Sequence, residues 1–152
     1  MSRLLLNHLT RECVAVGEFL ELLDQEANAM THGDFSSLPA LTERKAQLAD
    51  QIALLSRQRE TEQLRLGFTT DRSGSDAAAA AGGESLQNAW QQLKERAALA
   101  REHNYRNGVM IHTHLDFTRQ AINFLHAGGQ SLYGPTGTHH MGASNGNTLA
   151  QG

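Results

Sequence analysis

The chain has 152 residues and a formal net charge of −3, with 13 Lys and Arg against 16 Asp and Glu, so a broad basic surface for nucleic acid is not expected. Aromatic residues make up 5% and only two prolines occur, a composition that favours helices with aliphatic cores and argues against a β-sandwich. The single cysteine, Cys13, excludes an internal disulfide framework, and the length suits one domain with one core.

Residues 2–31 are predicted to form a first long helix. Its apolar positions alternate at spacings of three and four, which average about 3.5 residues, the period of a helix packed along a partner. This seam contains Leu6, Leu9, Cys13, Val16, Leu20, Leu23, Ala27 and Met30. Gly33 can adopt the left-handed conformation that ends a helix, so the first helix is expected to stop just before it.

Residues 36–66 are predicted to form a second helix, antiparallel to the first because the connection is short. Its seam contains Leu38, Leu41, Lys45, Leu48, Ile52, Leu55, Arg59 and Glu62. Two cations, Lys45 and Arg59, occupy positions where leucine would be more stabilising. Either they pair with carboxylates of the first helix, for which Glu12, Glu18 and Glu26 are candidates, or they extend to the rim of the bundle.

Residues 67–83 are rich in Ser, Gly and Asp and are predicted to form a mobile connection. Within it, residues 77–81 are five alanines with strong helix propensity but no polar face. They are expected either to extend the third helix or to belong to the linker.

Residues 85–126 are predicted to form the third and longest helix. Its seam contains Leu86, Trp90, Leu93, Ala97, Ala100, Asn104, Asn107, Ile111, His114, Thr118, Ala121 and Leu125. Gly108 is expected to mark a bend or a close helix crossing. After Gly108 a second apolar stripe appears, made of Met110, His114, Phe117, Ala121 and Phe124. A helix that is apolar on two sides needs two covers, which either the bundle or a partner supplies.

The predicted fold is therefore all-α, an elongated bundle of three long antiparallel helices with coiled-coil packing over residues 1–126. Residues 127–152 hold half of the 14 glycines and are predicted to form a flexible tail rather than a separate domain. Leu132 and Tyr133 are the apolar anchor of this tail.

Sequence motifs for chemistry are not found, so no catalytic, cofactor-binding or metal site and no enzymatic activity are expected. His112 and His114 lie on different helix faces, and the tail pair His139 and His140 offers at most a weak adventitious ion site. The N-terminal apolar run turns polar at Asn7, too early for a signal peptide, and no stretch reaches the roughly 18 apolar residues of a membrane span. A cytoplasmic protein without membrane insertion is expected.

Several motifs resemble the FlgN family of flagellar export chaperones. These are Leu20-x-x-Leu-Asp-x-Glu-Ala-x-Ala-Met30, the helix with Lys45 and Arg59, Asn104-x-x-Asn107-Gly108, and Leu132-Tyr133-Gly134-Pro135-x-Gly137. The resemblance implies a helical chaperone that binds the C-terminal helices of hook-associated proteins, at the hook–filament junction, through its own C-terminal part. It also implies docking on export-gate and export ATPase components. The stretch after Gly137 is not covered by these motifs.

Both arguments lead to the same hypothesis, that a client helix lies along the apolar stripe after Gly108. The predicted client-binding residues are Met110, Phe117, Ala121, Phe124, Leu132 and Tyr133. The alternative is that these side chains complete the core of the bundle. A chaperone is expected to be a monomer or weak dimer, whereas a generic coiled-coil adaptor would self-associate tightly through the same seams.

Overall fold

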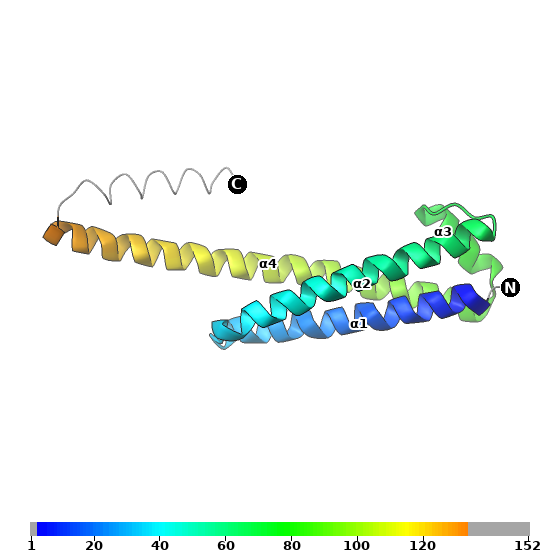
Figure 1. Ribbon diagram of the computed structural model, residues 1–152, viewed down its shortest axis with the longest axis horizontal. Coiled ribbons are helices and arrows are strands. Elements are labelled where there is room, and N and C mark those ends of the chain that lie inside the picture. Colours follow the sequence, from blue (N-terminus) through cyan, green and yellow to red (C-terminus); the bar gives the residue numbers. More distant parts are fainter. Residues whose placement is uncertain (1–2, 134–152) are drawn as a thin grey trace. The chain divides into compact units, whose positions relative to one another are not determined.

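The structure is a computed structural model that describes residues 3–133, with side chains up to residue 127. Its elements are α1 (Arg3–Thr31), a 3-10 turn η1 (Phe35–Ser37), α2 (Leu38–Arg65), α3 (Arg72–Ala81) and α4 (Glu84–Tyr133) (Figure 1). The described residues contain no strand, which confirms the all-α prediction. The chain divides into two compact units at Gly108, and each is described by itself.

The helices α1 and α2 form an antiparallel hairpin. Glu12 of α1 pairs with Arg59 of α2. Glu26, about four turns further along α1, pairs with Lys45, which is nearer the start of α2. The turn between the helices contains Gly33, whose φ of 72° is left-handed and therefore favours glycine. The predicted ends of the first two helices agree with the structure to within a few residues.

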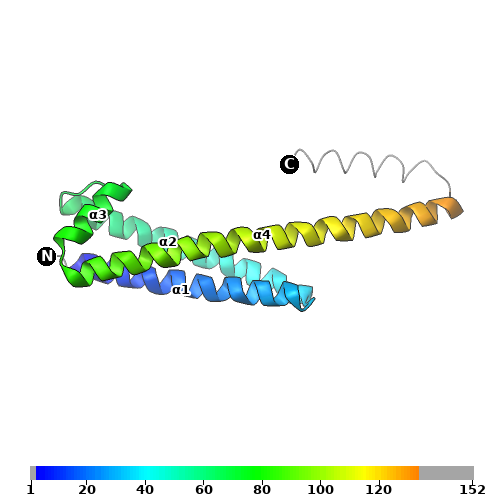
Figure 2. The ribbon, with the colours of Figure 1, turned by 180° about the vertical axis from the view of Figure 1, so that it is seen from behind.

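The core of the first unit is built from α1, α3 and the first half of α4, with Ile52 of α2 packed against it. Figure 2 shows that first half lying along α1. The buried residues of the core are Leu5, Leu9, Cys13, Val16, Leu23, Ala78, Leu86, Leu93 and Ala100. Polar contacts fix the register of the two helices: Arg96 donates to the Cys13 carbonyl at 3.1 Å, and Asn107 donates to the Leu23 carbonyl at 2.8 Å.

A separate helix, α3, lies where the sequence predicts a mobile connection over residues 67–83. Neither expectation for the five alanines is correct, because α3 ends at Ala81 and α4 begins at Glu84. The Asp71 side chain caps α3 by accepting from the Gly74 amide at 2.7 Å. A Cβ atom on Gly74 would collide with the Thr69 backbone, so this glycine permits a tight turn into the helix. Such a short helix depends on tertiary contacts, which sequence periodicity does not reveal.

The third predicted helix corresponds to α4, which continues through Gly108 to Tyr133 rather than ending at His126. Residues 127–133 are therefore helical where the flexible tail was predicted to begin, because each residue added to an existing helix gains a hydrogen bond without a new nucleation cost. A Cβ on Gly108 would meet no atom within 4 Å, so no close crossing at this glycine is seen among the described residues. The expected bend remains a prediction.

Candidate partner-binding site

Beyond Gly108, α4 carries large apolar side chains that are exposed. The fractional exposure is 70% for Phe117 and 77% for Phe124, and it is 69% for Leu125. Monomeric proteins rarely expose neighbouring apolar side chains of this size without a function. Among the described residues, these side chains do not complete a core, which argues against that alternative.

The sequence-predicted site residues fall into two groups. Phe117, Ala121 and Phe124 are exposed and Met110 is partly buried. Their spacing of seven, four and three residues places all four on one face of the helix. For Leu132 and Tyr133 the structure gives only the backbone at the end of α4, and their side chains lie outside what it describes.

Another row of apolar side chains runs beside this face, and its residues were not among the predicted client-binding residues. It consists of Ile111, Leu115, Ile122 and Leu125, of which the last three are exposed at 47% or more. At 100° per residue, the two stripes together cover about half of the helix circumference. The signal was in the sequence, because Leu115 and Ile122 are one heptad apart, but it could equally have indicated a core.

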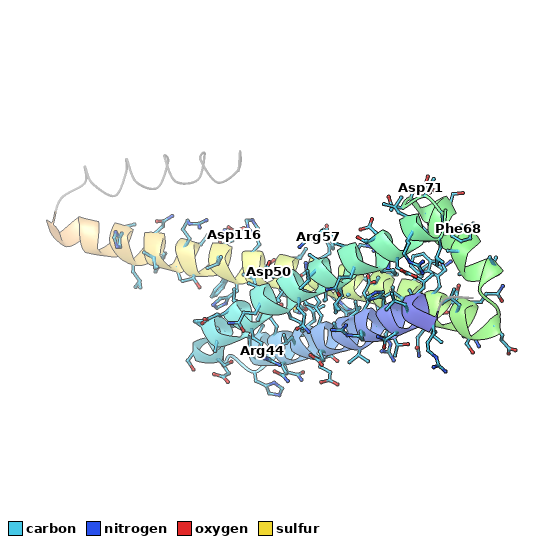
Figure 3. The ribbon with its side chains drawn as sticks, turned by 45° about the vertical axis from the view of Figure 1, so that its right-hand side comes forward. Arg44, Asp50, Arg57, Phe68, Asp71 and Asp116 are labelled. Atoms are coloured by element: carbon cyan, nitrogen blue, oxygen red, sulfur yellow. The ribbon has the colours of Figure 1, made fainter. Side chains whose placement is uncertain are left out.

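The opposite face of this segment is polar and paired within the helix. Arg119 donates to Asp116 at 3.2 Å, and the His112 ring nitrogen lies 3.6 Å from the same carboxylate (Figure 3). These exposed pairs contribute little to stability. They do keep this face hydrophilic, so a partner helix is expected to contact the apolar face.

Lys45 and Arg59, the two cations on the seam of α2, pair with carboxylates of α1, which is the first of the two alternatives expected from the sequence. Arg59 is 8% exposed and donates to Glu12 at 2.6 Å and to Gln63 at 2.7 Å. Its guanidinium also lies 5.2 Å from the centre of the Trp90 ring. Arg59 therefore does not extend to the rim of the bundle, and Glu18 is exposed rather than a partner.

The last buried polar cluster before Gly108 centres on Glu26, which is 2% exposed. Its carboxylate accepts from Lys45 at 3.2 Å and from Asn107 at 3.0 Å. Asn104 and Asn107 both belong to the predicted seam, but only Asn107 is buried, whereas Asn104 is exposed. A seam that drifts around a straight helix explains why the two asparagines differ.

A second polar cluster joins α3 to its neighbours. Gln63, 2% exposed, donates to the Thr69 carbonyl at 3.0 Å and to Ser75 at 3.1 Å. Trp90 donates to Asp76 at 2.6 Å, and this bond, together with that from Lys94, lowers the pKa of the Asp76 carboxyl. The bond from the Gly74 amide is the largest of the effects that lower the pKa of Asp71.

No arrangement for chemistry is found in the described part of the chain. Burial raises the pKa of the Cys13 thiol, against the opposing effect of Arg96, so the thiol is a poor nucleophile. Between residues 3 and 133 no group of three or more His, Cys, Asp or Glu side chains could hold a metal ion. The tail histidines His139 and His140 lie outside the described residues. None of the described helices combines the length and the apolar character that crossing a membrane requires.

Comparison with known proteins gives a consistent picture. The family model described as FlgN protein matches residues 1–140. A protein of Yersinia enterocolitica described as flagella synthesis protein FlgN is 31% identical over 139 residues, which cover 85% of this chain and 88% of that protein. Another with the same description, from Yersinia enterocolitica serotype O:8 / biotype 1B (strain NCTC 13174 / 8081), is 32% identical over 108 residues, 70% of this chain and 67% of its own length. No solved structure matches the chain.

Proposed function

We propose that this chain, which belongs to the FlgN family, is a cytoplasmic export chaperone that binds the helical C-terminal regions of flagellar hook-associated proteins. The family connects the chain to flagellum synthesis. The identity of the clients rests on the resemblance described above. The observation that carries the proposal is the exposed apolar face of α4 after Gly108, on which Phe117 and Phe124 are 70% and 77% exposed.

The proposed mechanism is sequestration. An amphipathic client helix lies against the apolar face of residues 110–125 and covers its own apolar residues there. Binding lowers the concentration of free client, which suppresses its premature association and degradation by mass action. This step needs no cofactor, and delivery would follow through contacts with export-gate or export ATPase components.

The alternative is a generic coiled-coil adaptor that self-associates through the same face. One observation favours keeping it: an apolar face that covers about half of a helix could pair with a second copy of itself. The two functions differ in what covers the face. The chaperone is expected to be a monomer or weak dimer that forms a discrete complex with its client, whereas the adaptor is expected to form a tight homo-oligomer.

The test is light scattering after size-exclusion chromatography, with and without a C-terminal fragment of a hook-associated protein. We expect Phe117→Asp and Phe124→Asp to abolish the complex while circular dichroism shows unchanged helix content. Asn123→Asp, on the polar face with Asp116 and Arg119, is the control and is expected to bind normally. A tight homo-oligomer that ignores the client would favour the adaptor.

A further inference from the structure

The first unit contains a groove that the proposed client site does not use. Two hollows, of about 340 and 270 Å³, share four lining residues, Val16, Ile52, Ala97 and Arg101, and therefore adjoin. All the residues that line them precede Gly108. The groove is thus separate in sequence from residues 110–125, which carry the proposed client site.

The length and the lining of the groove fit one face of a docked helix. Its apolar lining consists of Val16, Phe19, Ile52, Leu93, Ala97 and Ala100. The lining residues of α4 run from Trp90 to Asn104, which at 1.5 Å per residue is about 21 Å, enough for a helix of roughly 14 residues. The small alanines allow the backbone of an incoming helix to approach closely.

The charges of the groove are one-sided. Four cations line it, Arg59, Arg72, Lys94 and Arg101, against a single carboxylate, Glu12, which Arg59 already engages at 2.6 Å. Lys94 pairs with Asp76 at 3.1 Å. Within the described residues, Arg101 makes no ion pair, and it lines both hollows. The rim therefore selects for negative charge.

We propose that this groove docks an amphipathic helix of a partner protein that carries Leu and Ala on one face and Asp or Glu along its flank. Charge decides against a second copy of this chain. Its own exposed apolar segment, residues 109–127, carries Arg119 and three histidines but only one acidic residue, Asp116. The chain would then hold two helices at once, one in this groove and the client on the C-terminal face.

The single tryptophan of the chain reports on the groove. Trp90 lines the hollow of about 340 Å³ and is only partly buried. A docked helix would therefore cover the indole and shift its emission to shorter wavelength. The probe is a synthetic 14-residue helical peptide with Leu and Ala on one face and Glu on both flanks. A peptide with Lys in place of every Glu is its matched control.

We expect the Glu peptide to bind at least about tenfold more tightly than the Lys peptide, and the affinity to fall with added salt. Arg101→Glu is expected to weaken binding of the Glu peptide about tenfold. Arg106→Glu, an exposed change on the opposite face of the same helix, is expected to change it by less than about twofold. Ala97→Leu enlarges a side chain that lines both hollows and is expected to block binding without a change of charge.

Three results would overturn the proposal. The first is equal affinity for the two peptides, or no shift of Trp90 emission with either. The second is an equal effect of Arg101→Glu and Arg106→Glu with helix content preserved. The third is a homodimer of the free protein that shields Trp90 and is broken by Arg101→Glu, which would make a second copy the occupant. None of these results bears on client binding by Phe117 and Phe124, which is measured separately.

Discussion

The two halves of α4 have similar apolar periodicity but opposite exposure. Before Gly108, Leu86, Leu93 and Ala100 are at most 9% exposed, whereas beyond it Phe117 and Phe124 are 70% and 77% exposed. Periodicity therefore predicts an apolar face but not what covers it. In the first half the face is part of the core. In the second half the face is exposed, and the following predictions test this contrast in burial.

The largest effect is expected where the first half of the molecule buries charge. Glu12→Ala leaves the buried guanidinium of Arg59 without its carboxylate, which should lower the free energy of unfolding by about 3–5 kcal/mol in urea denaturation. The double variant Glu12→Ala/Arg59→Met should recover much of the loss, because no buried charge remains. A loss below about 1 kcal/mol for the single variant would show that water reaches the pair.

A matched pair of leucines tests the contrast in apolar burial. Leu23→Ala, at a position 1% exposed, should cost about 3 kcal/mol of unfolding free energy because it opens a cavity. Leu115→Ala, at a position 51% exposed, should cost less than about 0.5 kcal/mol in the same measurement. Similar losses at both positions would mean that the second half of α4 has a core of its own.

A smaller effect on stability is expected at the last buried polar cluster before Gly108. Asn107→Ala removes the donor to the Leu23 carbonyl and to Glu26, which should cost about 1–3 kcal/mol in thermal or urea unfolding. Asn104→Ala is the control, since that side chain is exposed, and it should be nearly neutral. Equal effects would show that Asn107 is not the polar residue that sets the register.

The smallest effect concerns the attachment of α3 and depends on pH. The pKa values of Asp71 and Asp76 are lowered in the folded protein, so their contribution to stability is present above the ordinary aspartate pKa and is lost as the pH falls through the lower folded value. Trp90 emission should therefore change below about pH 4, before the helix content measured by circular dichroism falls. Asp76→Asn should shift or remove this early change, and an unaltered profile would exclude the Asp76–Trp90 bond as its cause.

Much of the fold could be predicted because its signals are local. The seams, the capping glycines and the short connection locate α1 and α2, and Glu12 and Glu26 could be named as partners for buried cations. The α3 helix could not be predicted, because it is held by contacts with residues outside it. Gln63 of α2 donates to Ser75 of α3, and Ala78 of α3 packs in the core. The groove beside Trp90 was missed for the same reason, because its lining comes from residues far apart in the sequence.

At the candidate site, the sequence reveals the residues but not their role. The stripe of Phe117, Ala121 and Phe124 was evident from spacing, but spacing gave no means to decide between core and binding surface. The exposure of these side chains supports the second interpretation. The neighbouring stripe of Leu115 and Ile122 widens the predicted face, because both side chains are also about half exposed.

The cluster of Glu26, Lys45 and Asn107 divides α4 by local stability. The bond between Asn107 and Glu26 is buried and that between Lys45 and Glu26 is partly buried, whereas the helix beyond Gly108 gains few buried contacts. The later turns can therefore open and close at a much lower free energy than the earlier ones. Amide hydrogen exchange should therefore be slow up to Asn107 and fast after it. A partner that binds the later turns would raise the free energy of their local opening and so slow amide exchange there. The exchange rates of the first half would stay unchanged.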